Sequence, residues 1–137
     1  METSDFIDQW HSVVRNRDPS RLEAILADDV VFHSPVVHSP QSGKALTLGY
    51  LTAAMHVLGG EAFRYVEEWS GENSAVLEFV TEIDGCVVDG VDMIHWNDEG
   101  RIVSFRVFVR PLKAINLLHG LMAKKLAAAG MISARSG

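Results

Sequence analysis

Four runs of residues in the second half of the chain alternate between apolar and polar side chains. They span residues 63–70, 75–83, 86–96 and 102–110, and short segments rich in Gly, Asn and Asp separate them. This alternation is typical of a strand with one buried face, and Asp84-Gly85 is a strong signal for a two-residue hairpin. We therefore expect four consecutive strands that form an antiparallel meander.

The first half of the chain repeats its apolar residues with a helical period instead. Residues 6–14, 19–26 and 46–57 each predict an amphipathic helix. Thr3 or Ser4 should cap the first helix, and Asp18 should cap the second, which ends at Asp28-Asp29. The β-branched and aromatic residues 30–34 predict a strand that ends at Pro35. After the meander, residues 112–129 predict a closing helix.

This order of elements predicts an α+β fold. The chain has 137 residues with no internal repeat or linker, so residues 1–130 should form a single domain and residues 131–137 a disordered tail. A long twisted antiparallel sheet curls, and helices packed in its concave face leave a pocket. Such a pocket is the default place to look for a ligand.

Composition excludes several classes of function. The formal net charge of −6 argues against nucleic-acid binding and against an anionic membrane surface. The single cysteine, Cys86, permits no disulfide within the chain, and we expect it to be a buried thiol. The histidine spacing fits no standard zinc pattern, so we expect no metal and no cofactor. The first residues resemble no secretory signal, and we expect a cytoplasmic protein.

Asp92 is the most informative polar residue. Successive side chains on a strand point to opposite faces, so Asp92 shares a face with Val88, Gly90, Ile94 and Trp96. An ionised carboxylate among apolar residues is costly unless it is partnered, protonated or functional. We therefore look for chemistry at this position.

Three segments in this order and spacing resemble the nuclear transport factor 2-like superfamily. They are the helix-to-strand junction at residues 26–32 (LADDVVF), the Ser34-Pro35 that follows it, and the hairpin at residues 92–102 (DMIHWNDEGRI). This group includes steroid delta-isomerases, SnoaL-type polyketide cyclases and limonene epoxide hydrolase-like enzymes. The resemblance implies a cone-shaped, cystatin-like fold: three N-terminal helices packed in a strongly curved antiparallel sheet, plus a C-terminal helix.

The steroid isomerase pattern matches this chain only in part. Asp92 falls on the position of that family's protonated aspartate, which donates a hydrogen bond to an oxyanion. The family's tyrosine position holds Trp10, and its carboxylate base, just before a proline, is replaced by Ser34. The resemblance therefore does not imply steroid isomerase activity. The Asp-Arg-Asp arrangement of the epoxide hydrolases has no match, because parity places Arg106 on the outer face.

The candidate catalytic residues are Asp92, His33 and Ser34. His33 or Ser34 could move a proton, but neighbouring residues on a strand face opposite ways, so both cannot enter one pocket without a bulge. Asp92 could equally be a structural carboxylate paired with Trp10 or a tyrosine. The expected ligand-binding residues are Trp10, Val14, Phe32, Tyr50, Phe79, Val88, Phe105, Val107 and Val109.

Three functions remain open at this stage. The first is a protein that binds a hydrophobic small molecule without turnover, and the second is an isomerase, cyclase or lyase acting on a hydrophobic carbonyl compound through Asp92. The third is a dimeric interaction module with a vestigial pocket. Mixed apolar and charged residues on the outer sheet face, such as Val66 and Phe108, suggest a homodimer through that face.

Overall fold

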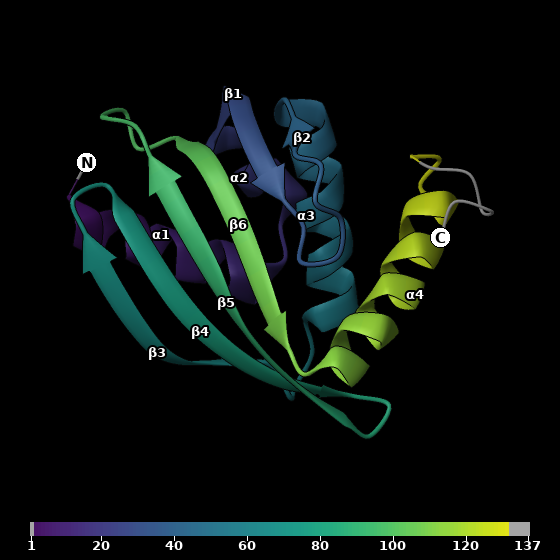
Figure 1. Ribbon diagram of the computed structural model, residues 1–137. Coiled ribbons are helices and arrows are strands. Elements are labelled where there is room, and N and C mark those ends of the chain that lie inside the picture. The colour runs from purple at the N-terminus through teal and green to yellow at the C-terminus, as the bar shows by residue number, and fades with distance from the viewer. Residues whose placement is uncertain (1, 132–137) are drawn as a thin grey trace.

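A curved sheet with helices on its inner face forms the frame of the molecule (Figure 1). The computed structural model describes residues 2–131. The helices are α1 (Thr3–Asn16), α2 (Pro19–Ala24), α3 (Lys44–Leu58) and α4 (Leu112–Ala128). The strands are β1 (Leu26–His33), β2 (Gln41–Ser42), β3 (Arg64–Gly71), β4 (Ser74–Ile83), β5 (Cys86–Trp96) and β6 (Ile102–Arg110).

The predicted meander is confirmed. Strands β3 to β6 lie side by side in chain order and pair antiparallel, and the sheet order is β2-β1-β6-β5-β4-β3. One pairing is different in kind, because β1 runs parallel to β6. Parallel neighbouring strands need a long crossover connection. The chain between β1 and β6 supplies it through α3 and the three other strands of the meander.

The first half departs from the sequence prediction at two boundaries. The second helix ends at Ala24, and β1 begins at Leu26, so Asp28 and Asp29 lie exposed inside a strand rather than ending a helix. The register between β1 and β6 shifts in this part of β1, which lets a strand accommodate two adjacent acids. The predicted cap of the first helix is also wrong: Glu2 is the N-cap of α1, and no side chain caps it.

The N-cap of the second helix and the end of the third follow the prediction. The Asp18 side chain accepts a hydrogen bond from the backbone N–H of Ser20, and Pro19 is the first helical residue. Gly59 ends α3 and donates its N–H to the carbonyl of Met55.

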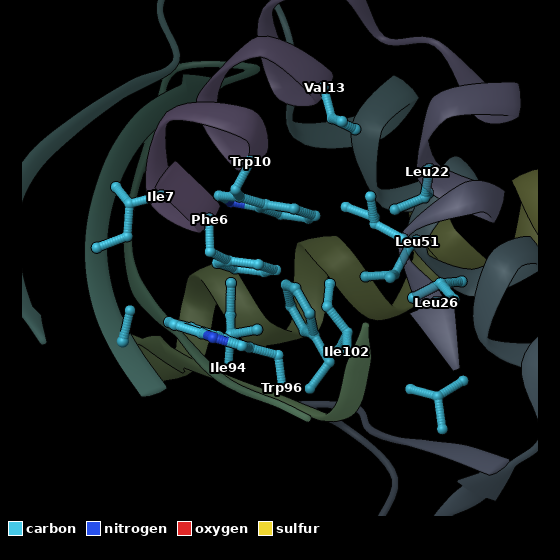
Figure 2. Close-up of a cluster of buried hydrophobic side chains, with 14 of the residues drawn as sticks. Phe6, Ile7, Trp10, Val13, Leu22, Leu26, Leu51, Ile94, Trp96 and Ile102 are labelled. Carbon is cyan, nitrogen blue, oxygen red and sulfur yellow. The ribbon is translucent and has the colours of Figure 1, made fainter. Parts of the chain in front are cut away.

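The hydrophobic core has two parts. The larger part joins α1 and α2 to the inner face of the sheet. Its Phe6 and Trp96 rings stack face to face (Figure 2). Their centroids are 3.9 Å apart. The smaller part lies where α4 crosses the far end of the sheet and consists of Phe79, Cys86, Val88, Ala114 and Leu118. The burial of Cys86 is as predicted.

None of the helices in residues 2–131 is long and apolar enough to cross a membrane. Within the same residues, no three His, Cys, Asp or Glu side chains gather as a metal site would require. The predicted tail lies outside the described residues except for Met131.

Candidate functional site

Asp92 lies on the inner face of β5, as its parity predicts. Leu77 of β4 and Val107 of β6 flank it in the sheet register. Only 8% of Asp92 is exposed, and the inward Ile94 beside it on the same strand is fully buried. The carboxyl group therefore has little contact with bulk water.

A chain of two hydrogen bonds holds this carboxyl group in place. The Tyr65 hydroxyl donates to Oδ2 of Asp92 over 2.6 Å. The indole Nε1–H of Trp10 in turn donates to the Tyr65 hydroxyl over 3.1 Å. Asp92 is thus partnered by a tyrosine, one of the two structural partners considered from the sequence, and Trp10 acts through that tyrosine. Among the described residues, no hydrogen bond reaches Oδ1 of Asp92, which leaves that oxygen for another partner.

Burial raises the pKa of Asp92 to about 7, although the hydrogen bond from Tyr65 acts in the opposite direction. The same buried pair raises the pKa of Tyr65 well above 10, first because the phenol is desolvated and second because the Asp92 charge opposes a phenolate. Near neutral pH the pair therefore holds one exchangeable proton on Asp92, while Tyr65 remains a hydrogen-bond donor.

Gly90 makes the floor of the site possible. It precedes Asp92 by two positions on the same face of β5, and a Cβ atom at Gly90 would lie 2.5 Å from Cζ of Phe79 and 2.7 Å from the carbonyl oxygen of Phe108. The Phe79 ring can lie over the strand beside Asp92 only because this position has no side chain.

The carboxyl group opens onto a cavity of about 190 Å³ between the sheet, α1, α3 and α4. Its lining is mostly apolar and rich in aromatic rings. The lining includes these residues that were expected in the pocket from the sequence: Trp10, Val14, Phe32, Ser34, Tyr50, Phe79, Asp92, Phe105, Val107 and Val109.

Val88 was expected in the pocket but does not line it. Val88 is fully buried in the smaller part of the core, under Ala114 and Leu118. Val88 does face inward, as its parity predicts. It is a core residue rather than part of the cavity wall because α4 covers β5 at Val88 and leaves the strand open at Asp92.

Ser34 lines the cavity, but its oxygen is already engaged. Ser34 Oγ accepts hydrogen bonds from the backbone N–H groups of Val36 and Val37, at 3.0 and 3.1 Å. These bonds shape the loop after β1. They occupy the lone pairs that a proton acceptor would need, so the geometry gives Ser34 no role as a base.

The structure does not bring His33 together with Asp92. His33 lines a neighbouring cleft, together with His38 and Arg106, and does not line the cavity beside Asp92. Burial lowers the pKa of His33, and the nearby Arg106 guanidinium and His38 lower it further. Arg106 itself is exposed on the outer face, as its parity predicts.

Among the ionisable residues that line the cavity, sequence reasoning missed Tyr65 and His119. Tyr65 belongs to β3, whose other residues are all exposed. The signal in the sequence was the aromatic pair Phe63 and Tyr65 at a spacing of two. His119 is on α4 and lines the cavity beside the buried Leu118. Its helix was predicted, but no local pattern indicates that this side of α4 borders a cavity.

Comparison with known proteins places the chain in a family. The SnoaL-like domain family matches residues 7–105. A steroid delta-isomerase from Pseudomonas aeruginosa is 32% identical with a TM-score of 0.87, over 96% of this chain and 98% of that one. An uncharacterized protein with a cystatin-like fold from Silicibacter pomeroyi is 30% identical with a TM-score of 0.78, over 95% and 88% of the two chains.

More distant similarities show the fold alone. A protein from Catenulispora acidiphila with a ketosteroid isomerase-like fold, solved in complex with trimethylamine, is 14% identical with a TM-score of 0.62, over 83% of this chain and 91% of that one. No curated protein matches the chain. The family match over most of the chain, together with the two similar structures, shows that this protein belongs to the SnoaL-like domain family of the nuclear transport factor 2-like superfamily.

Proposed function

We propose that this protein binds a small, mostly hydrophobic molecule whose single polar atom contacts Asp92. The observation that carries the proposal is a buried carboxyl group with one oxygen fixed by Tyr65 and the other without a partner among the described residues. Asp92 lines the cavity, so a ligand atom there that hydrogen-bonds to Oδ1 would gain affinity and a fixed orientation.

Cavity size limits the ligand. An apolar cavity of roughly 150 Å³ is large enough to hold a benzene molecule. The 190 Å³ beside Asp92 suits one small ring with a short substituent. Drug-sized ligands occupy pockets of about 300–1,000 Å³, so a fused four-ring compound would require α4 to move.

The protonation state of Asp92 decides which polar atom is preferred. A protonated carboxyl group can donate to a carbonyl oxygen, whereas a carboxylate accepts from a phenol or an ammonium group. Because the pKa of Asp92 is about 7, both forms are present near neutral pH. The Catenulispora acidiphila protein solved with trimethylamine supports including an amine among the candidate ligands.

Thermal shift measurements with cyclohexanone, phenol and trimethylamine would test this function. We expect at least one compound to raise the melting temperature of the wild-type protein and to do so less in Asp92→Asn. Asp98→Asn, in the exposed β5–β6 turn, is the matched control and should behave as wild type. If none of the compounds changes the melting temperature, or if all shift Asp92→Asn as much as wild type, Asp92 is not the polar centre of a ligand site.

Catalysis by isomerisation, cyclisation or lyase chemistry is a second candidate function. A carboxylic acid kept neutral near pH 7 can stabilise an enolate by hydrogen bonding. The likeness to a steroid delta-isomerase supports this candidate. Ser34 in place of a carboxylate counts against it unless another side chain serves as the base.

We also propose that the partner of this chain is a second copy, docked on the outer sheet face. Trp69 and Phe108 are each about half exposed there, at 54% and 51%. Asp89, the larger cause, and Glu67 raise the pKa of Glu78, although Arg110 pairs with Asp89 at 3.4 Å. Arg106 forms no ion pair within the described residues, and a two-fold axis on this face could bring the partner subunit's Arg106 to this acidic group.

Light scattering should show a dimer that Arg106→Glu weakens, and a monomeric wild-type protein would contradict the proposal.

A further inference from the structure

The cavity contains a histidine that the three predicted catalytic residues do not include. Among its described lining residues, four side chains can ionise: Tyr50, Tyr65, Asp92 and His119. Tyr65 is committed to Asp92 by a 2.6 Å hydrogen bond. Tyrosines lose their proton only at high pH, whereas histidine is the side chain that exchanges protons closest to neutral pH.

His119 is placed to meet a ligand rather than to stabilise the fold. It follows the buried Leu118 on α4 and precedes Met122 by one turn, and all three residues line the cavity. The His119 side chain is exposed, and no side chain of the described residues hydrogen-bonds to it. Its ring nitrogens are therefore available, and the residue lies at the water-facing edge of a cavity that contains Asp92.

The other candidate bases are excluded by their surroundings. Ser34 Oγ already accepts two backbone hydrogen bonds, and His33 lines the neighbouring cleft with Arg106 but not the cavity itself. The position before Pro35 therefore supplies no base, while α4, a different element, brings an imidazole to the same cavity.

We propose that His119 is the catalytic base of this cavity and that it works with Asp92 on a small monocyclic ketone. This inference rests on the proposed binding function and commits to the enzymatic alternative. Protonated Asp92 donates to the ketone oxygen through Oδ1, while a neutral ring nitrogen of His119 removes a proton from the carbon next to the carbonyl. The C–H electron pair forms the enol double bond, and the carbonyl π pair moves to the oxygen. The imidazolium then returns the proton to carbon, so the cycle requires no oxidant, reductant or cofactor.

The two roles require opposite protonation states. Asp92 must hold its proton in order to donate it, and His119 must lack one in order to accept. Because the pKa of Asp92 is about 7, the alkaline side of the profile should fall as that group ionises.

Hydrogen exchange of cyclohexanone in D₂O, followed by proton NMR, tests the inference with the full chain. We expect the wild-type protein to accelerate exchange at the two carbons next to the carbonyl, and His119→Ala to lose about 10²–10⁴-fold of that acceleration. Added imidazole should restore part of the loss in His119→Ala but none in Asp92→Asn. His56→Ala, an exposed histidine on α3 outside the cavity, is the matched control and should exchange cyclohexanone as wild type does.

The experiment distinguishes failure of the His119 inference from failure of the proposed binding function. If the wild-type protein binds cyclohexanone, as judged by thermal shift, but does not accelerate exchange, the inference is wrong and the binding function stands. Full exchange in His119→Ala, or a loss that imidazole does not restore, would assign the residue no role as a base. If none of the ligand panel binds, the proposed function fails and this inference fails with it.

Discussion

The two ends of the curved sheet use the same inner face in different ways. At one end α1 lies against the sheet, and Phe6 stacks on Trp96 with rings 13° from parallel. At the other end α4 touches the sheet through Ala114 and Leu118 and leaves 190 Å³ open beside Asp92. We call these the packed end and the open end.

The contrast is visible along a single strand. Ile94 and Trp96 at the packed end of β5 are 0% and 3% exposed, and Asp92 on the same face borders the cavity. The alternation of side chains is the same throughout. The two parts of β5 differ in how closely a helix packs against them. Close packing makes one part hydrophobic core, and looser packing leaves the other part as the wall of a cavity.

Truncation at the packed end should have the largest effect on stability. Phe6→Ala removes a fully buried ring from close packing, and we expect it to lower the free energy of unfolding by about 3–5 kcal/mol. Met122→Ala, at the wall of the open end, should cost less than about 1 kcal/mol because its side chain already borders space. Urea unfolding of both variants checks the comparison, and equal losses would show that the open end is as closely packed as the other.

Asp92→Asn should stabilise the protein above neutral pH. Folding raises the pKa of Asp92 from 3.8 to about 7, so between these values the folded state holds a proton that the unfolded chain has lost. Stability therefore falls as pH rises through this window, by up to roughly 4 kcal/mol. Asparagine carries no charge, so its stability should change less over the window.

The measurement is urea unfolding at pH 4.5 and pH 8 for wild type, Asp92→Asn and the surface control Asp98→Asn. The control should follow the wild-type pH dependence. If all three proteins lose the same stability between the two pH values, Asp92 does not carry a raised pKa.

Tyr65→Phe should have a smaller effect that also depends on pH. It removes the hydrogen bond that lowers the pKa of Asp92, so that pKa should rise further. We expect the free energy of unfolding to fall by about 1–3 kcal/mol at pH 8, where a buried carboxylate is left without its donor, and by less at pH 5.

NMR titration of the Asp92 carboxyl carbon measures the pKa directly. Tyr50→Phe is the control, because the Tyr50 hydroxyl hydrogen-bonds to no side chain of the described residues, and a pKa shift as large there would argue against a specific role for Tyr65.

Much of the fold could be predicted from local patterns. The bounds of β5 and β6 match the alternating runs at residues 86–96 and 102–110. Asp18 and Pro19 mark the start of α2 as their chemistry predicts. The start of β1 could not be predicted, because Leu26 fits a helical stripe as well as a strand, and pairing with β6 far along the chain decides between them.

Strand parity made the direction of the site residues on β5 and β6 predictable. Alternation alone places Asp92, Phe105, Val107 and Val109 on the inner face. Whether an inward side chain is core or cavity wall was not predictable, as Val88 shows. The hydrogen bond of Tyr65 to Asp92 and the place of His119 in the same cavity depend on the curvature of the sheet and the angle of α4.

The sequence by itself determined that a carboxyl group would lie among apolar neighbours inside an α+β domain, because strand periodicity is a local property of the backbone. The tertiary structure decided which donor holds that carboxyl group, which histidine shares its cavity and how much space remains. Those features depend on contacts between residues 27 or more positions apart, and no local pattern encodes the distance between two packed elements.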